Sequence, residues 1–479
     1  MFTPLLPKVP RILIHARGQM TPEETEFWQS LRFALREKNF ELMLIGHYFP
    51  HKHLDAPLLK VRDGLDKVIR TSLGKGWGSW LPLPNKLDEE NLLERERFWR
   101  GEEIDALHKE KRRRALYFFK SFYTLALKTS KPCLTVIWNG HHPQEMILDS
   151  LCKQCGCPVL YIERGPFQNT IQFDSDGILG GTKIANQKKW SWAGIDNKDY
   201  WISLLGKIKN DYQKKKSTWW SQPLSIGGEK LRRNLKIPEN AKVLLFAGQI
   251  DEDSQNLLYS PLFKDNLSAF KWLCEQLSEK QNVFILGKHH PKSKKSPEDY
   301  NEIIKNKGAG VWINNVSLED CLAISDRVSA VNSTVLYEAL LMDKPILMMG
   351  KSLLSNKGIA YEINNLNGSP KILDEWLEAS DLEKRKKLWI DFGAYLLAKE
   401  LFSMKPPESN DGMRDAAALS DYLISMSKSS DIDYSKLDID IVFIDEQTAW
   451  GDVVRVVVKS EILYDKLSKK IKKLIQKFW

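Results

Sequence analysis

Short apolar segments alternate with helical patterns along most of this chain, in two separate series. The first series has apolar runs at 11–15, 40–45, 134–138 and 158–162, with helical patterns at 23–38, 104–128 and 143–155. The second has apolar runs at 242–247, 282–286, 311–313, 327–331 and 345–349, with helical patterns at 263–279, 317–324 and 333–342. Strands that alternate with helices form parallel sheets, because a parallel connection needs a long crossover. The chain is therefore predicted to be α/β, with two parallel-sheet domains.

The two series also predict where the chain of 479 residues divides. We expect an N-terminal Rossmann-like domain over 1–185, a helical connection over 186–235 and a second Rossmann-like domain over 236–380. Residues 381–479 carry mostly helical patterns and are expected to form a C-terminal extension.

The first residues do not have the pattern of a signal peptide. Arg11 and His15 interrupt the apolar stretch, and no basic segment precedes it. No run reaches the roughly 18 apolar residues of a membrane-spanning helix. We therefore expect a cytoplasmic protein.

Three of the six cysteines cluster at 152–157. A structural zinc site usually takes four ligands from paired Cys-x-x-Cys units, and the chain has no second pair. We expect buried thiols here and no metal, because a free cysteine packs as a small apolar side chain.

The net charge of +9 is compatible with anionic substrates, nucleic acid or an anionic membrane. The last 21 residues contain seven lysines, with apolar residues at helical spacing. Such a helix either lies on an anionic membrane or packs on the protein with its lysines in solvent, and both interpretations stay open. The sequence contains no recognised nucleic-acid-binding module, so nucleic acid is not an expected partner.

Polar residues gather where the expected strands end, which is the edge of a parallel sheet that binds ligands. The segment from Gln249 to Asp253 follows the strand at 242–247. Asp251 and Asp253 are candidates for a nucleophile or a general base. A simpler explanation is an acidic loop that caps the next helix.

Two more strand ends carry groups that bind anions. Lys288, His289 and His290 offer cationic or N–H donors, and adjacent histidines point to different sides, so one of the two is expected to face a ligand. Asn332, Ser333 and Thr334 precede a helix, whose first N–H groups can hold a phosphate. A solvated basic turn and plain helix capping are the alternatives. The chain has no Walker-type loop and no Gly-x-Gly-x-x-Gly.

In the N-terminal half, Glu163 ends a strand and is a candidate to act on an acceptor hydroxyl. Arg164 adjoins it, and Asp174 lies in a short acidic segment nearby. A surface salt bridge is the simpler explanation for Glu163.

The joint order of these segments resembles the capsule polysaccharide biosynthesis family of bacterial β-Kdo glycosyltransferases, including the Kdo-transferase modules of capsule linker and O-antigen assembly. The resemblance covers roughly residues 130–365. It rests on Trp138-Asn139-Gly140, Glu163-x-Gly165, Asp174-x-x-Gly177, Gln249-x-x-x-Asp253, Lys288-x-His290-Pro291, and Asn332-Ser333-Thr334 leading to Glu338-Ala339-Leu340. The flanks carry no matching motif.

The resemblance implies a GT-B-like fold, in which two Rossmann-like domains face a central cleft. It implies that Kdo is transferred from CMP-β-Kdo with retention, to a capsule or lipopolysaccharide O-antigen glycan or glycolipid. No cofactor is implied, since the nucleotide sugar is a substrate. The place of action would be the cytoplasm, with a peripheral position at the inner face of the membrane if the lysine-rich end binds lipid.

The resemblance also implies roles for individual residues. Asp253 would be the nucleophile, with Asp251 as its rival, and Glu163 would act as acid/base or position the acceptor. Lys288 and His290 would hold the phosphate or the Kdo carboxylate, and Ser333 and Thr334 the phosphate. The other candidates are Gln249, His289, Asn332 and Glu338 on the donor side, and Asn139, Arg164 and Asp174 on the acceptor side.

Other functions stay open at this point. Sialyltransferases, heptosyltransferases and non-hydrolysing epimerases share the same fold, and a fold does not fix a function. A non-catalytic partner of a polysaccharide assembly complex is a further alternative. Asp251-x-Asp253 also has the spacing of a metal-binding Asp-x-Asp pair, and a metal there would exclude the nucleophile role.

Overall fold

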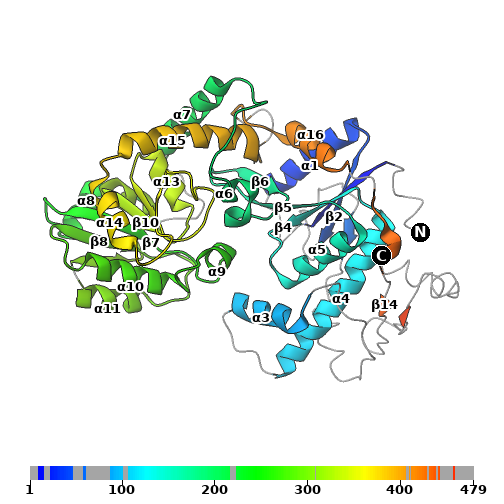
Figure 1. The fold of residues 1–479 in the computed structure, drawn as a ribbon, viewed down its shortest axis with the longest axis horizontal. Helices are drawn as coiled ribbons and strands as arrows, with labels where there is room; N and C mark the ends of the chain where they lie inside the picture. Colours follow the sequence, from blue (N-terminus) through cyan, green and yellow to red (C-terminus); the bar gives the residue numbers. More distant parts are fainter. Residues whose placement is uncertain are drawn as a thin grey trace. The chain divides into compact units, whose positions relative to one another are not determined.

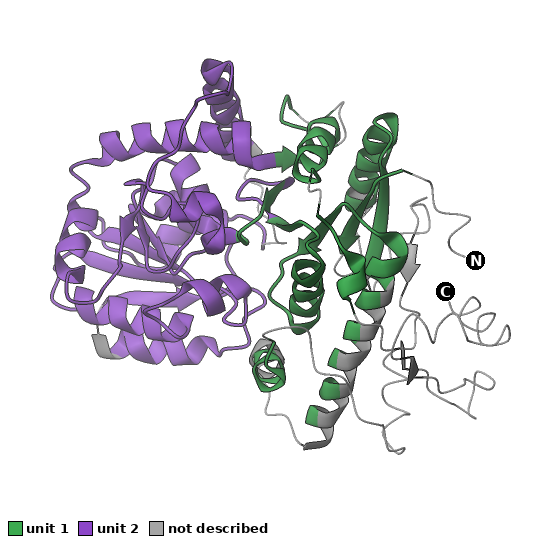
Figure 2. Ribbon diagram, turned by 45° about the vertical axis from the view of Figure 1, so that its right-hand side comes forward, with its two compact units in different colours: residues 1–163, 171–178, 402–479 green, residues 164–170, 179–401 purple. Residues whose placement is uncertain are grey.

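The computed structural model describes residues 9–15, 22–46, 58–60, 87–100, 106–215, 223–307, 309–405, 409, 411–428, 431–437, 441–442 and 457–458. The chain forms two compact units (Figures 1 and 2). Unit 1 consists of Met1–Glu163, Ile171–Ile178 and Phe402–Trp479, and unit 2 of Arg164–Thr170 and Leu179–Leu401.

Within the described residues, unit 1 is built on a seven-stranded sheet. The spatial order is β13 (Leu401–Ser403), β6 (Thr170–Asp174), β5 (Val159–Arg164), β4 (Leu134–Trp138), β1 (Arg11–His15), β2 (Glu41–Gly46) and β3 (Leu58–Lys60). Neighbouring strands from β5 to β3 pair in parallel. The order of strands along the chain reverses between β1 and β4, which is where open α/β sheets bind ligands.

Alternate side chains of these strands enter one hydrophobic core, because successive residues of a strand point to opposite faces. Ile12 and Ile14 of β1 are fully buried in it. Trp28 of α1 (Pro22–Glu37) and Leu419 of α16 (Ala416–Met426) pack into the same core. Burial of such apolar area stabilises the unit by roughly 25 cal/mol per Å².

Unit 2 has a six-stranded sheet among the described residues. The spatial order is β12 (Tyr361–Glu362), β11 (Ile346–Met348), β10 (Arg327–Ala330), β7 (Lys242–Ala247), β8 (Val283–Lys288) and β9 (Gly310–Ile313). All five neighbouring pairs are parallel. If the six strands are numbered by their order along the chain, their order in the sheet from β9 is 3-2-1-4-5-6. This is the doubly wound Rossmann arrangement. The switch point lies between β7 and β10.

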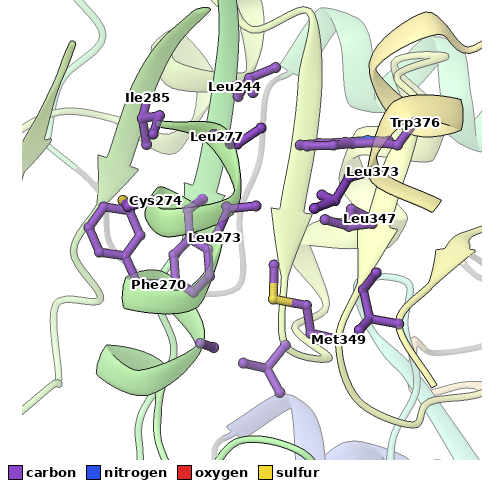
Figure 3. Packing of buried hydrophobic residues seen from close by; sticks show 14 of the residues in the cluster. Leu244, Phe270, Leu273, Cys274, Leu277, Ile285, Leu347, Met349, Leu373 and Trp376 are labelled. Atoms are coloured by element: carbon purple, nitrogen blue, oxygen red, sulfur yellow. The ribbon is translucent and has the colours of Figure 1, made fainter. Parts of the chain in front are cut away.

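One core of unit 2 lies between this sheet and the helices that pack on it, and Figure 3 shows part of it. Phe270, Leu273 and Cys274 of α10 (Asn266–Leu277) are fully buried there beside Leu244 of β7. Trp376 of α14 (Ser369–Glu378) is equally buried, and its indole N–H donates to the Pro345 carbonyl. The apolar positions of α10 recur every three or four residues, which places them on one helical face.

The α/β class with two parallel sheets is confirmed. The units differ from the expected domain boundaries at both ends of the second domain. α7 (Lys198–Lys215) packs on α15 (Leu382–Tyr395), so the expected helical connection belongs to unit 2. The chain from Phe402 onward belongs to unit 1, because β13 joins the sheet of unit 1.

The sequence patterns did not predict β6 and β13. The hydrogen bond from Gly165 N to Thr170 O closes a tight turn between β5 and β6, too short for the helix crossover that the predictions relied on. β13 has three residues and pairs with β6, more than 200 residues earlier in the chain. Such a short apolar run has no periodicity of its own.

The clustered cysteines are free thiols in α5 (Pro143–Cys155) and directly after it. Cys152, Cys155 and Cys157 are all buried, as small apolar side chains are. In the part of the chain that the structure describes, no helix is long and apolar enough to cross a membrane. The lysine-rich segment 459–479 lies outside the described residues, so its helix stays a prediction.

Candidate functional site

The predicted donor-side residues follow strands β7, β8 and β10, at the carboxyl edge of the unit 2 sheet. β7 and β10 are neighbours and flank the switch point. The loops after them diverge there, because their helices cover opposite faces of the sheet. Because β7 and β10 are neighbours, the acidic segment that follows β7 and the Asn332 segment that follows β10 begin side by side.

Gln249 and Asn332 bind each other across this switch point. Gln249 Nε2 donates to Asn332 Oδ1 over 3.0 Å, and Gln249 Oε1 accepts from the Asn332 backbone N–H over 3.0 Å. Asn332 Nδ2 donates to the carbonyls of Gln255 and Tyr259. Both amides are buried, so these bonds lie in a medium where an unpaired amide is costly. Their polar atoms are directed at the protein.

The two aspartates of the acidic segment have different surroundings. Asp251 is partly buried, and its Oδ1 accepts from the backbone N–H and the side-chain amide of Asn266. Asp253 is exposed and is the N-cap of α9 (Ser254–Tyr259), where it accepts from the Gln255 N–H over 2.9 Å. The capping interpretation is thus correct for Asp253, and the cap also fixes the orientation of its carboxylate.

The Lys288 ammonium is directed into the protein. The side chain is 4% exposed, and Nζ donates to the carbonyls of His289 and Asn314. Burial lowers the pKa of this ammonium. In this arrangement Lys288 fixes the loop after β8.

The adjacent histidines have different hydrogen-bond partners. His289 is buried, and its Nδ1 accepts from the indole N–H of Trp312. His290 is less buried, and its Nδ1 accepts from the Lys292 N–H over 3.1 Å. Burial, followed by the nearby charge of Lys288, lowers the pKa of His290 to about 4. His290 is therefore neutral at pH 7, with its proton on Nε2.

Ser333 and Thr334 precede α13 (Val335–Leu341). Ser333 Oγ accepts from the Val335 N–H, and Thr334 is exposed and makes no side-chain capping bond. Glu338 lies in the same helix but is 7% exposed, and it accepts a short hydrogen bond from the Tyr212 hydroxyl. Burial raises the pKa of Glu338 to about 7. Glu338 thus joins α13 to α7 inside unit 2.

The predicted acceptor-side residues lie at the carboxyl ends of β4, β5 and β6. Asn139 is buried and donates from Nδ2 to Glu163 Oε2 over 3.0 Å. Asn139 has φ +64° and Gly140 has φ +85°, and a Cβ on Gly140 would lie 2.5 Å from the Tyr161 ring. The Trp138-Asn139-Gly140 segment therefore needs these residue types to turn the chain.

The other two acceptor-side candidates, Arg164 and Asp174, are the last residues of β5 and β6. Arg164 is exposed at the end of β5. Asp174 is buried at the end of β6, and its Oδ1 accepts from the Asp176 N–H over 2.7 Å. That bond shapes the turn toward Gly177, which is a structural role.

Asn266 is a residue of this site that the motifs did not include. It is fully buried at the start of α10 and bonds to Gln249 and Asp251. Its sequence context shows only a capping pattern, since Asp265 and Ser268 form a capping box. Its partners lie 15 and 17 residues away. Within the described residues, no three His, Cys, Asp or Glu side chains are grouped as metal ligands.

Residues 211–372 match the capsule polysaccharide biosynthesis protein family. The match contains the whole six-stranded sheet of unit 2 and every predicted donor-side residue. The resemblance to this family is confirmed for that part of the chain.

The chain is also similar to individual proteins. It is 21% identical over 281 residues to Protein FixF of Sinorhizobium fredii (strain NBRC 101917 / NGR234), a match of 57% of this chain and 62% of that relative. It thus spans less than two thirds of this curated relative. Two similar solved structures are those of Thermosulfurimonas dismutans KpsC, beta Kdo 2,7 transferase (TM-score 0.40, 14% identity, covering 72% of this chain and 98% of that one), and of Thermosulfurimonas dismutans KpsC, beta Kdo 2,4 transferase (TM-score 0.40, 16% identity, covering 61% and 87%).

Proposed function

We propose that this chain is a glycosyltransferase that transfers Kdo from CMP-β-Kdo to a bacterial surface glycan, with retention of configuration. The observation that carries the proposal is the position of Asp253 and Ser333 in the loops that flank the switch point of unit 2. Both lie in the region that matches the capsule polysaccharide biosynthesis family. Their motifs are the ones that resemble β-Kdo transferases.

The donor has a phosphate and a carboxylate, so its site needs several N–H or cationic donors. His290 carries its proton on Nε2, because Nδ1 accepts from the Lys292 N–H, and in this proposal that N–H donates to an anionic oxygen of the donor. The exposed Thr334 supplies a hydroxyl in the loop after β10. In the sheet, β7 lies between β10 and β8, the strand that precedes His290. Lys288 acts indirectly in this proposal, through the loop that carries His290.

In the proposed first step, the Asp253 carboxylate attacks the anomeric carbon of Kdo. The bond from that carbon to the phosphate oxygen breaks, and CMP leaves with the electron pair. In the second step, an acceptor hydroxyl attacks the same carbon, its proton passes to the Glu163 carboxylate, and Asp253 is released. Two inversions give retention, as in retaining glycosidases.

Glu163 supports its proposed role through its contact with Asn139, which fixes the carboxylate at the end of β5. We propose a capsule or O-antigen glycan as the acceptor, at the inner face of the cytoplasmic membrane. The lysine-rich segment 459–479 would bring the chain to that surface by attraction to anionic lipids.

Intact-protein mass spectrometry with CMP-Kdo generated in place tests the proposal. We expect a mass increase of one Kdo residue, with release of CMP, for the wild type and for the control Asp299→Ala, whose carboxylate lies on the exposed face of α11 (Pro297–Lys307). Asp253→Ala should show neither. If the wild type forms no adduct and releases no CMP, the Kdo assignment is wrong, and a panel of other nucleotide sugars is the next test. Release of CMP without an adduct would contradict the covalent step alone.

A further inference from the structure

Asn266 holds the acidic loop of unit 2 through four hydrogen bonds to Gln249 and Asp251. Its Oδ1 accepts from the Gln249 N–H over 3.1 Å, and its Nδ2 donates to the Gln249 carbonyl and to Asp251 Oδ1. Its own backbone N–H donates to the same Asp251 oxygen over 2.8 Å. Asn266 is 0% exposed, so this set of bonds is shielded from water. Buried amides with satisfied bonds fix one local geometry.

The carboxylate of Asp251 binds Asn266 through one of its two oxygens. Oδ1 takes two N–H donors, and one of them is the backbone N–H of the first residue of α10. Oδ2 is buried and has no hydrogen-bond partner among the described residues. Neither oxygen is therefore directed to solvent, whereas Asp253 is exposed two residues later.

The loop between these anchors leads straight into the cap of α9. The Asn256 side chain donates to the Ile250 carbonyl over 2.9 Å, and Asp253 caps the helix at the Gln255 N–H. We therefore expect a change at Asp251 or Asn266 to displace the peptide that carries Asp253. Reacting groups are sensitive to such shifts, since a displacement of about 1 Å can lower a rate by roughly 100-fold.

We propose that Asp251 and Asn266 are a positioning pair, which holds the acidic loop so that Asp253 alone of the two aspartates meets the substrate. This inference rests on the proposed function for the role of Asp253. It assigns Asp251 a contact that needs an acceptor oxygen and no negative charge.

Isosteric variants distinguish an anchoring role of Asp251 from the nucleophilic role proposed for Asp253. Asp251→Asn keeps an Oδ1 that accepts both bonds from Asn266, so we expect kcat for CMP release from CMP-Kdo within about 3-fold of the wild type. Asp253→Asn should abolish release, because an amide is not a nucleophile here. Asp251→Ala and Asn266→Ala should each lower kcat by roughly 100-fold, with a smaller change in KM.

The double variant Asp251→Ala/Asn266→Ala tests whether the two residues act together. We expect it to be no slower than the worse single variant, and its midpoint of thermal unfolding to fall by less than the sum of the single shifts. If the shifts of the thermal unfolding midpoint in the two single variants add up in the double variant, the proposal of a positioning pair is wrong. Loss of activity in Asp251→Asn with an unchanged midpoint would also overturn it, since the charge of Asp251 would then be required.

The two proposals fail in different ways. A wild type that leaves CMP-Kdo intact would contradict the proposed function, while the unfolding cycle would still decide whether Asp251 and Asn266 form one unit. Turnover by the wild type with additive midpoint shifts would keep the proposed function and remove the positioning pair.

Discussion

Two adjacent histidines show how position decides chemistry at the scale of the residue. His289 is buried against Trp312, and His290 is partly buried and accepts from the Lys292 N–H. Burial lowers the pKa of both. Each is therefore a neutral donor and acceptor at pH 7, so an anion bound at His290 meets a neutral N–H.

This neutrality predicts how nucleotide binding depends on pH. His290→Asn should weaken binding of CMP, and the ratio of the two dissociation constants should stay constant from about pH 5.5 to 8, because the pKa of His290 is about 4. Isothermal titration calorimetry of both proteins gives the ratio and cancels the titration of CMP itself. A ratio that changes around pH 6.5 would contradict the neutral histidine.

Glu338 predicts a pH dependence of stability. Its pKa is about 7 in the folded protein, against an ordinary value of 4.5. A raised carboxyl pKa means that the folded state binds the proton more tightly than the unfolded state. Its contribution is complete below pH 4.5 and is lost as the pH rises through 7, by up to about 3 kcal/mol. Urea unfolding of the wild type and Glu338→Gln across this range measures the difference.

The variant Tyr212→Phe tests what sets the pH range over which Glu338 loses its contribution to stability. The hydroxyl of Tyr212 stabilises the ionised carboxylate, so its loss should raise the pKa of Glu338 further and move the stability loss to higher pH. The same pH profile in Tyr212→Phe and the wild type would show that this hydrogen bond does not set the pKa.

At the scale of the element, the Gln249–Asn332 contact joins the ends of β7 and β10. The two strands pair in parallel as far as Phe246 and Ser329, and beyond them the two amides connect the loops that follow. The acidic loop and the Ser333 loop are therefore fixed relative to each other. Under the proposed function, the donor would therefore bind to a preformed site.

Removal of one amide tests this connection. Asn332→Ala should lower the free energy of unfolding by about 2–3 kcal/mol, because Gln249 and two backbone carbonyls lose buried partners. Asn210→Ala, on an exposed position of α7, is the control and should change it by less than about 0.5 kcal/mol. Equal losses in the two variants, measured by urea unfolding, would show that the contact is dispensable.

At the scale of the molecule, the chain returns to unit 1 after it has built unit 2. β13 lies beside β6 at the edge of the unit 1 sheet. α16 packs beside α1 over its core (Figure 1). Leu419 and Leu423 fill that core together with Phe27 and Trp28. Unit 1 is therefore formed from both ends of the described chain.

This return predicts that a change near the end of the chain destabilises unit 1. Leu419→Asp places a charge in a core position that is 0% exposed, and we expect a loss of at least about 3 kcal/mol. Hydrogen exchange should then rise in β1 and β2 and stay unchanged in β7 and β8. Ser425→Asp, on the exposed face of α16, should leave both sheets protected. Faster exchange in unit 2 alone would contradict the assignment of α16 to unit 1.

The periodicity of apolar residues sufficed to predict most strands and helices and the α/β class. The predicted run at 242–247 has the bounds of β7, and the helix at 143–155 has those of α5. Local pattern carries this information because strands and helices have fixed repeats of side-chain direction. The motifs after those strands, with their order along the chain, likewise led to the family that residues 211–372 match.

The sequence determined which residues follow each strand of the sheet, and only the tertiary structure decided where their side chains point. Lys288, Gln249 and Asn332 have the residue types of ligand contacts, yet their polar atoms bind carbonyls and amides of the chain itself. Asn266 and the strand β13 act on partners far away in sequence, so no local pattern marks them. The physical reason is that hydrogen bonds and burial depend on distances between segments, which a repeat of apolar residues does not encode.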